Sequence, residues 1–226
     1  NGSSENSRNS LFSSFAEKVP LVFINGDTEG LHVHNVLADQ KFGTRLALDY
    51  LFELGHRRIS FVRARHGFSY DVREEEFRDY CTERGLELQE QSIIHIPYGN
   101  TEEAIVMTEE AFLSVLRSKA RPTAVLASND LMAMGLVRAA GKAGLEIPHD
   151  LSIVGHDDTL VAKMGKIGLT SVNIKTEAMG RSAAEILVQV IQDEEADPRR
   201  IVYVAALAKR ESCGEVPEPY DILEGV

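Results

Sequence analysis

The stretch from residue 122 to residue 159 constrains the fold more than any other part of this chain. Residues 124–127 are a short apolar run, residues 131–143 place apolar side chains at helical spacing, and residues 151–154 are a second apolar run. Two buried strands with a helix between them are typical of a parallel pair, because a parallel connection needs a helical crossover. The stretch therefore predicts one βαβ unit of a parallel sheet.

Polar side chains follow the carboxyl end of each predicted strand. Asn129 comes just after the first run, and Asp157 comes just after the second. Between them, Asp130 is expected to cap the helix at its amino end, and Gly144 to end it in a left-handed conformation. Open parallel sheets bind small ligands outside the carboxyl ends of their strands. We therefore expect a ligand site at Asn129 and Asp157.

A second strand–helix–strand pattern comes earlier in the chain. Residues 21–25 and 59–62 are apolar runs, and residues 46–54 form a helical stripe between them, which predicts a second βαβ unit. Two groups of such units predict an α/β fold with two Rossmann-like lobes, each a parallel sheet flanked by helices. The first (N-terminal) lobe is predicted to comprise residues 1–63 plus 175–204. The second (C-terminal) lobe is predicted to comprise residues 64–174 plus 205–226.

Charge and composition limit the partners of the chain. Its 226 residues carry a formal net charge of −11, whereas binding to nucleic acid requires a concentrated basic surface. The chain is therefore not expected to bind nucleic acid by itself, but an acidic regulatory module joined to a separate basic domain fits this balance. No apolar run approaches the length of a membrane span, and the 2 cysteines match no disulfide framework or metal spacing. We expect a cytoplasmic protein with no membrane partner.

The motifs of several enzyme classes are missing from the sequence. It contains no P-loop, no dinucleotide-binding G-x-G-x-x-G, no G-x-S-x-G elbow and no H-E-x-x-H zinc motif. His156, Asp157 and Asp158 are adjacent on one predicted turn, where three neighbours rarely converge on one metal ion. The sequence therefore predicts a protein that is not an enzyme, with no catalytic residue, no cofactor and no metal site.

Three side chains suit a hydroxylated ligand. Asp157 offers two acceptor oxygens that can bridge neighbouring sugar hydroxyls, Asn129 offers a donor and an acceptor, and Arg73 offers a rigid fork of donors. Each has a structural alternative. Arg73 can instead pair with the glutamates at 74–76, Asn129 can serve only as a helix cap, and Asp157 can be a turn residue. The sequence leaves these alternatives open.

A series of motifs spread along the chain is similar to one family. The chain resembles the effector-binding core of LacI/GalR-type bacterial transcription regulators, which share the type I periplasmic-binding-protein fold. The most specific part is the block from residue 121 to residue 159, RPTAVLASNDLMAMGLVRAAGKAGLEIPHDLSIVGHDDT. The other motifs, in chain order, are VPLVFIN, ADQ-x-x-G, ELGHRRISFV, R-x-x-x-F from Arg73 to Phe77, LTSV, EAMGRSAAEIL and KRES.

The resemblance implies a ligand site and a mode of action. Arg73, Asn129 and Asp157 match the positions that hold the effector in this family. Ser69, in the loop before Arg73, and Phe42, at the mouth of the Asp39 loop, match two further pocket positions. The implied effector is a sugar or a related small metabolite, bound between the two lobes. The implied protein is a homodimeric transcriptional repressor, in which effector binding changes how attached heads sit on operator DNA.

Parts of the family's pattern have no counterpart in this chain. The DNA-binding head and the first strands of the first lobe are missing, so we expect an incomplete first lobe and operator binding only through an absent amino-terminal head. The chain also contains no Trp. Any aromatic platform for a sugar ring is therefore expected from Phe42, Phe68 or Tyr98.

Two other functions fit the same scaffold. An extracytoplasmic sugar-binding protein of a transporter has the same fold and the same kind of pocket. Its full-length amino terminus would carry a signal peptide, whereas that of a regulator would carry a basic DNA-binding head. An enzyme on a two-lobed scaffold would turn its ligand over, and no nucleophile or cofactor loop in the sequence favours it. The regulator is therefore the leading prediction.

Overall fold

The chain folds into two compact units. The computed structural model describes residues 12, 14–16, 18–26, 28, 31–192 and 197–216. Unit 1 comprises Asn1–Asp39 and Ile174–Ala205, and unit 2 comprises Gln40–Asn173 and Ala206–Val226. The chain therefore passes from one unit to the other three times.

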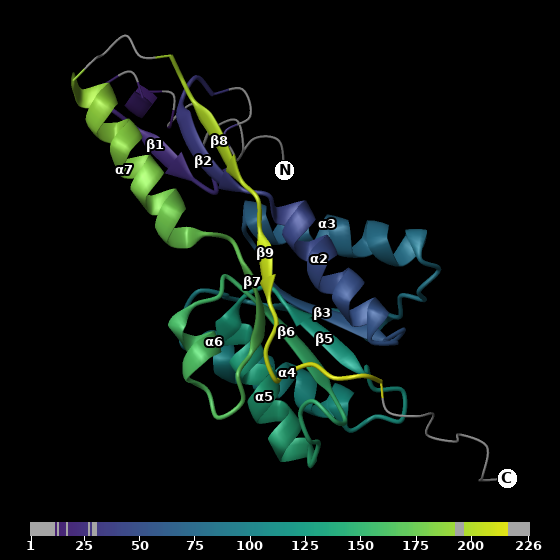
Figure 1. The fold of residues 1–226 in the computed structure, drawn as a ribbon. Helices are drawn as coiled ribbons and strands as arrows, with labels where there is room; N and C mark the ends of the chain where they lie inside the picture. The colour runs from purple at the N-terminus through teal and green to yellow at the C-terminus, as the bar shows by residue number, and fades with distance from the viewer. Residues whose placement is uncertain are drawn as a thin grey trace, which may run out of the picture. The chain divides into compact units, whose positions relative to one another are not determined.

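Unit 1 contains a three-stranded parallel sheet. Strand β2 (His34–Ala38) lies between β1 (Val22–Ile24) and β8 (Arg200–Tyr203) and pairs with both. Helix α7 (Thr176–Gln192) packs along β1 and β2 (Figure 1). Its buried side chains, which include Met179, Ala183 and Ile186, recur every three or four residues, as expected for one face of a helix.

Unit 2 is built on a six-stranded sheet of order β4-β3-β5-β6-β7-β9. The first five strands of this order are parallel to one another, and β9 is antiparallel to β7. The strands are β3 (Ile59–Ala64), β4 (Ile93–Ile96), β5 (Ala124–Ala127), β6 (Ser152–His156), β7 (Thr170–Asn173) and β9 (Ala206–Ala208). The predicted α/β fold, with parallel sheets flanked by helices, is confirmed.

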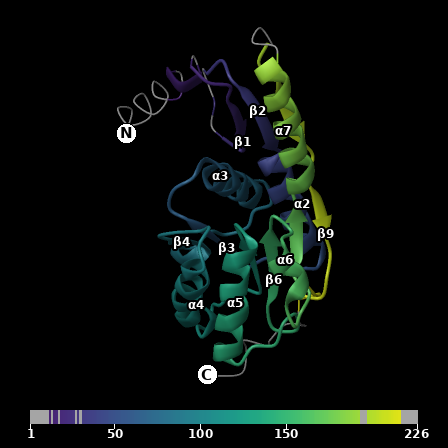
Figure 2. The same ribbon diagram turned by 90° about the vertical axis from the view of Figure 1, so that its left-hand side faces the viewer.

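Helices cover both faces of the sheet in unit 2. Phe61 of β3 stacks on Phe77, with 5.3 Å between the ring centroids, whereas its neighbour Val62 belongs to the core cluster that contains Phe112 and Met132. Successive strand residues face opposite sides of a sheet, so both sides are buried. Figure 2 shows α4 and α5 packed side by side. The helices are α2 (Gln40–Glu53), α3 (Phe68–Glu83), α4 (Glu103–Leu116), α5 (Asp130–Ala143) and α6 (Leu160–Met164), with a short 3₁₀ turn at Glu90–Ser92.

No helix within the described ranges is both long and apolar enough to cross a membrane.

Residues 40–63 belong to a different unit from the one predicted. They were expected in the first lobe, because residues 21–62 read as a βαβ unit. In the structure, α2 and β3 are part of unit 2, since β3 pairs with β4 and β5, while β1 and β2 pair with each other and with β8. Strand, helix and strand follow one another as expected, but the two strands join different sheets. The later segment of unit 1 spans residues 174–205, where 175–204 was predicted.

The helix of the most informative stretch begins one residue earlier than expected. Asn129, not Asp130, is its N-cap: the Asn129 side chain accepts a hydrogen bond from the backbone N–H of Met132 at 2.9 Å. Asp130 lies in the first turn, where its carboxylate accepts from the Ser171 hydroxyl at 2.7 Å and from the backbone N–H of Thr159 at 2.7 Å. This buried carboxylate therefore ties α5 to β7 and to the turn after β6. Gly144 ends the helix in the left-handed conformation, as predicted.

Alanine substitutions at two glycines of α5 are expected to have opposite effects on the free energy of unfolding. A Cβ at Gly135 would lie 2.5 Å from the backbone oxygen of Ile105 in α4, whereas a Cβ at Gly141 meets nothing within 4 Å. Gly135→Ala is therefore expected to lower the free energy of unfolding by roughly 1–3 kcal/mol through overpacking. Gly141→Ala is expected to raise it by about 0.5–1 kcal/mol, because glycine costs helix stability.

Urea unfolding of both variants and the parent, followed by circular dichroism, measures the difference. Equal midpoints for the two variants would contradict the close approach of α4 and α5.

Candidate functional site

The Arg73 side chain connects three elements of unit 2. Arg73 lies in α3 and is only 4% exposed. Its Nε donates to Oε1 of Gln40 at 2.8 Å, and its Nη1 donates to the backbone oxygen of Ser128. Its Nη2 lies 3.6 Å from Oδ1 of Asp157. Arg73 is thus held between the start of α2 and the residues that follow β5 and β6, at the carboxyl edge of the sheet.

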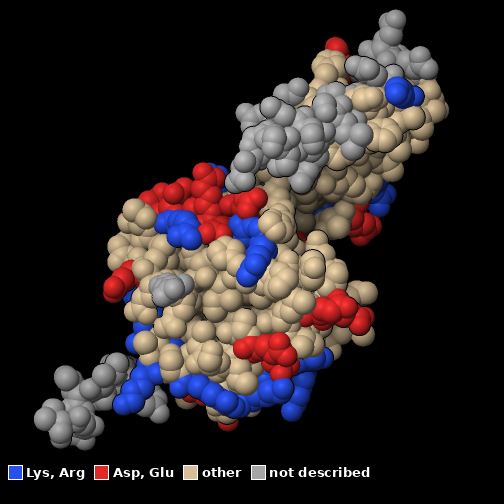
Figure 3. All heavy atoms as spheres, turned by 180° about the vertical axis from the view of Figure 1, so that it is seen from behind, with Lys and Arg blue, Asp and Glu red and all other residues tan. Residues whose placement is uncertain are grey.

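The glutamates next to Arg73 pair with other cations, so the alternative in which Arg73 pairs with them does not hold. Figure 3 shows acidic and basic side chains mixed over the part of unit 2 where α3 lies. The ion pairs of the three glutamates are Glu74 with Arg63 (3.0 Å) and Arg78 (2.7 Å), Glu75 with Lys41 (3.0 Å), and Glu76 with Arg45 (2.6 Å). Glu74 also lies within hydrogen-bond distance of Nε2 of His95, at 2.8 Å.

The Asn129 side chain caps a helix and also holds the loop after β4. Its Oδ1 caps α5, and its Nδ2 donates to the backbone oxygen of Gly99 at 2.7 Å and to Oδ1 of Asn100 at 3.1 Å. The Tyr70 hydroxyl also donates to Oδ1 of Asn100, at 2.7 Å. Asn129 is 4% exposed. Its amide therefore fixes the loop after β4, and both of its N–H groups have protein acceptors.

Asp157 occupies a strained turn directly after β6. Its φ is 94° and that of Asp158 is 51°. Both values lie in the left-handed region, which residues other than glycine rarely adopt. The backbone N–H of Asp157 donates to the oxygen of Val172 at 2.8 Å, and that of Asp158 donates to the Ser171 hydroxyl at 3.1 Å. These bonds to β7 hold the turn. Strain of this kind clusters at ligand sites, which agrees with the predicted role of Asp157.

The Asp157 carboxylate is partly exposed and ionised. The side chain is 29% exposed, and its Oδ1 lies 2.9 Å from Nδ1 of His156. Burial acts to raise the pKa of Asp157, but the hydrogen bond with His156 and the charge of Arg73 outweigh it and hold this pKa below its usual value. Burial, together with the Arg73 charge, lowers the pKa of His156 to about 4. At neutral pH the turn therefore presents one carboxylate beside one guanidinium and a neutral imidazole.

Asp158 has a structural role despite its position beside Asp157. Its Oδ1 accepts from Nη2 of Arg210 at 2.6 Å, and its Oδ2 accepts from Nδ2 of Asn173 at 2.8 Å. Both carboxylate oxygens are thus used to hold the turn against β7 and the segment after β9. Among the described residues, no group of three or more His, Cys, Asp or Glu side chains is placed to hold a metal ion.

Ser69 and Phe42 both lie in first turns of helices. Ser69 was expected in a loop before Arg73, but α3 begins at Phe68, so Ser69 is one turn before Arg73 in the same helix and is half-buried. Phe42 lies in the first turn of α2, two residues after Gln40, and is exposed. The role of these two residues in ligand binding remains a prediction.

Exposed aromatic side chains follow the strands at the same edge. Phe68 begins α3 after β3, and Tyr98 follows β4; both are exposed, as is Phe42. Aromatic faces of this kind stack on sugar rings. All three candidates for a platform are therefore accessible.

The structure shows three residues at the site that the sequence did not predict to belong to it. Gln40 orients Arg73, Tyr70 joins the Asn129 and Asn100 network, and His156 contacts Asp157. Gln40 belongs to the ADQ motif and His156 directly precedes Asp157, so both were within the stretches that drew attention. Nothing in the pattern around Tyr70 distinguishes it from an ordinary core residue.

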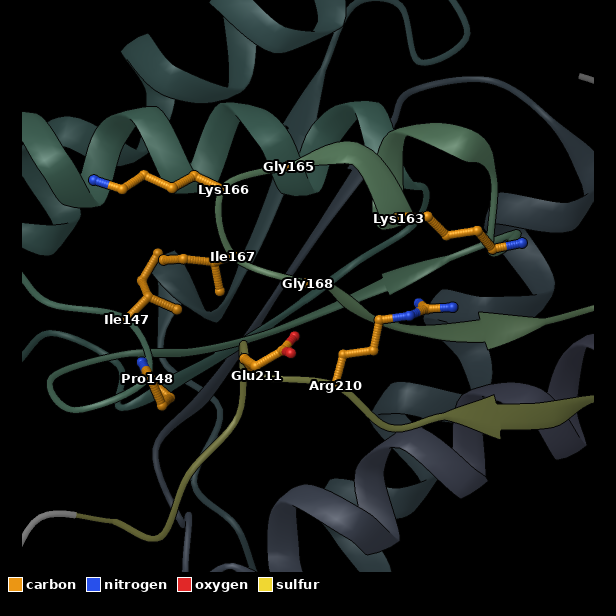
Figure 4. Close-up of a pocket in the computed structure, with 9 residues that line it drawn as sticks. All are labelled: Ile147, Pro148, Lys163, Gly165, Lys166, Ile167, Gly168, Arg210 and Glu211. Carbon is orange, nitrogen blue, oxygen red and sulfur yellow. The ribbon is translucent and has the colours of Figure 1, made fainter.

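A separate cavity of about 420 Å³ lies elsewhere in unit 2. Figure 4 shows that the Lys163 and Lys166 side chains point away from its middle, while the Glu211 carboxylate points towards Gly168. Its walls come from the residues before β6, the end of α6 with the segment that leads to β7, and the residues after β9. None of the predicted ligand residues lines it.

Two α/β units joined by three chain crossings, with polar groups at the carboxyl edge of a parallel sheet, define a protein of the periplasmic-binding class. Residues 48–213 match the family described as periplasmic binding protein-like domain, and the chain belongs to this family. The predicted resemblance to LacI/GalR regulators is confirmed by the relatives and solved structures that follow.

The chain is similar to the HTH-type transcriptional repressor PurR of Erwinia tasmaniensis, at 30% identity over 88% of this chain and 58% of that protein. It is also similar to the solved structure of a LacI transcriptional regulator from a Rhodococcus species, with a TM-score of 0.80 and 27% identity over 93% of this chain and 75% of the other. A LacI family regulator from Enterococcus faecium, solved with bound ribose, gives a TM-score of 0.75 and 26% identity over 87% and 71%. The chain thus spans a little over half the length of the first of these relatives.

The strained φ of Asp157 predicts a difference between two substitutions. Asp157→Ala and Asp157→Gly both remove the carboxylate beside Arg73, but only glycine adopts a φ of 94° without steric cost. We therefore expect the glycine variant to have the higher free energy of unfolding, by about 1 kcal/mol.

Chemical denaturation of the two variants under identical conditions measures this difference. Because both lack the same contacts, an alanine variant as stable as the glycine variant would show that the turn is unstrained.

Proposed function

We propose that this chain is the effector-sensing core of a bacterial transcription regulator, a repressor that binds a sugar or a related small metabolite. One observation carries the proposal: Arg73 and Asp157 meet at 3.6 Å at the carboxyl edge of a parallel sheet, within a family whose relatives are transcriptional regulators. The E. faecium regulator, solved with bound ribose, supports a sugar as the class of ligand.

The chemistry of the site suits binding rather than catalysis. Arg73 donates two of the five N–H groups of its guanidinium, to Gln40 and to the Ser128 oxygen, and its Nη2 lies 3.6 Å from Asp157. A guanidinium beside a carboxylate offers one donor and one acceptor to a hydroxyl, which is both. We infer a cytoplasmic protein that is not an enzyme and that acts on operator DNA through a separate amino-terminal head, with ligand binding as the signal.

Asp157 is expected to be the main determinant of ligand affinity. Asp157→Asn keeps the shape of the side chain but replaces a carboxylate acceptor with a donor. We expect the affinity for the sugar ligand to fall about tenfold or more, because a hydrogen bond to a charged group contributes roughly 1.5–3 kcal/mol. Calorimetric titration with ribose, and with a panel of pentoses and hexoses, measures the loss.

Asp79→Asn is the matched control, since it makes the same chemical change at an exposed position of α3. Its affinity should equal that of the parent. Equal affinities of parent and Asp157→Asn would remove Asp157 from the site, and a parent that binds no sugar of the panel would overturn the sugar proposal.

We propose further that the protein is a homodimer and that α6 lies in the interface. Leu160 and Met164, one helical turn apart on α6, are 71% and 79% exposed. Large apolar side chains so exposed on neighbouring positions mark contact surfaces. A second copy of the chain is the partner that the resemblance to dimeric regulators implies.

Charge at this surface is expected to prevent association. The double variant Leu160→Glu/Met164→Glu should sediment as a monomer at concentrations where the parent is a dimer, because a carboxylate cannot be buried without a partner. Val106→Glu, on α4, changes another exposed apolar residue and should leave the dimer intact. A double variant that remains dimeric would place the interface elsewhere.

A further inference from the structure

His156 lies underneath the ligand-facing turn and contacts its carboxylate. It is the last residue of β6 and is 1% exposed. Its Nδ1 lies 2.9 Å from Oδ1 of Asp157, and its Nε2 is buried without a hydrogen-bond partner among the described residues. The imidazole therefore has a single polar contact, and that contact is with the residue proposed to hold the ligand.

The contact determines which nitrogen carries the proton. An ionised carboxylate can only accept hydrogen bonds, so Nδ1 must be the donor and must be protonated. A neutral imidazole then has no proton on Nε2, which suits a nitrogen that has no acceptor nearby. Burial and the charge of Arg73 on α3 hold the pKa of His156 at about 4, against the opposite pull of Asp157. The ring is consequently neutral throughout the physiological range.

The two oxygens of Asp157 are in different situations. Oδ1 faces both His156 and Nη2 of Arg73, at 2.9 and 3.6 Å. Oδ2 takes part in no hydrogen bond among the described residues, and the side chain is 29% exposed. The carboxylate is thus held by one oxygen and open at the other, which differs from the expectation that both oxygens bridge neighbouring hydroxyls.

We propose that His156 is a positioning residue for the ligand site: as the neutral Nδ1–H tautomer it anchors Oδ1 of Asp157, so that Oδ2 alone is presented to a hydroxyl of the ligand. The proposal rests on the role of Asp157 in the proposed function. It assigns to a buried histidine the task of orienting the carboxylate on a turn whose φ of 94° already restricts the backbone. Arg73 on α3 and Asp130 on α5 act on the Asp157 carboxylate, and the neighbouring Asp158 is paired with Arg210 and Lys163.

A purely structural role for His156 predicts different behaviour. If the ring only filled space in the core, phenylalanine would replace it without effect on Asp157, because Nε2 has no partner to lose. If Nδ1–H is what matters, asparagine should replace it in part, since its amide N–H can occupy nearly the same place as Nδ1. Glutamine, whose amide reaches the place of Nε2 instead, should not. The three variants therefore separate the two roles.

The test is a ¹³C-carboxyl NMR titration of Asp157 in the parent and in His156→Asn, His156→Gln and His156→Phe. We expect a pKa below the usual aspartate range in the parent and in His156→Asn, and a pKa about one unit higher in the other two. The ¹⁵N shifts of His156 in the parent should show the Nδ1–H tautomer, with no titration between pH 5.5 and 8. Ribose affinity should fall about fivefold to tenfold in His156→Phe and recover in His156→Asn.

An unchanged Asp157 titration in His156→Phe, or the Nε2–H tautomer in the parent, would overturn the proposal. The tautomer is measured on the unaltered protein, so a variant that fails to fold does not remove the test. The carboxyl titration needs no ligand. A parent that binds no ribose would therefore count against ribose as the effector in the proposed function, while the titration still decides the role of His156.

Discussion

The buried charge of Arg73 is the constraint on which the carboxyl edge of unit 2 depends. A guanidinium at 4% exposure has lost most of its hydration, and an uncompensated charge in that position costs several kcal/mol. Gln40, the Ser128 carbonyl and the Asp157 carboxylate supply the compensation. These three partners come from the start of α2 and from the ends of β5 and β6. The need to solvate one cation therefore fixes the mutual position of the elements that form the site.

The other polar residues of this edge are organised around the same requirement. Asp130 joins α5 to β7, and Asp158 joins the turn after β6 to Arg210, so each acid next to a site residue has a structural partner of its own. Asp157 is the carboxylate left with an open oxygen, on a backbone held in the left-handed region. The hydrogen bonds and ion pairs of the neighbouring residues thus hold Asp157 in a backbone conformation that it would not adopt alone.

Most of the strands and helices were predictable from the sequence, because apolar periodicity reports burial directly. The placement of Asn129 and Asp157 at one edge of the sheet also followed from the rule that ligand sites form at the carboxyl ends of parallel strands, whereas Arg73 was identified through its match to the family motif. What the pattern did not contain was the sheet that each strand joins: residues 21–62 look like one βαβ unit, yet β3 pairs within unit 2. Nor did it distinguish Asn129 from Asp130 as the cap, since both side chains suit that position. Pairing and side-chain direction depend on contacts distant in sequence.

The double use of Asn129 has a consequence for changing what such a sensor recognises. Its Oδ1 caps the amino end of α5, and its Nδ2 holds the loop after β4. A replacement at this position therefore has to accept a hydrogen bond from the helix and donate hydrogen bonds to the loop at the same time. Phe42, Phe68 and Tyr98, the residues predicted to form an aromatic platform, have exposed rings. A combinatorial library that randomises these aromatic positions and leaves the buried amide and guanidinium intact would explore new specificities without dismantling the scaffold that presents them.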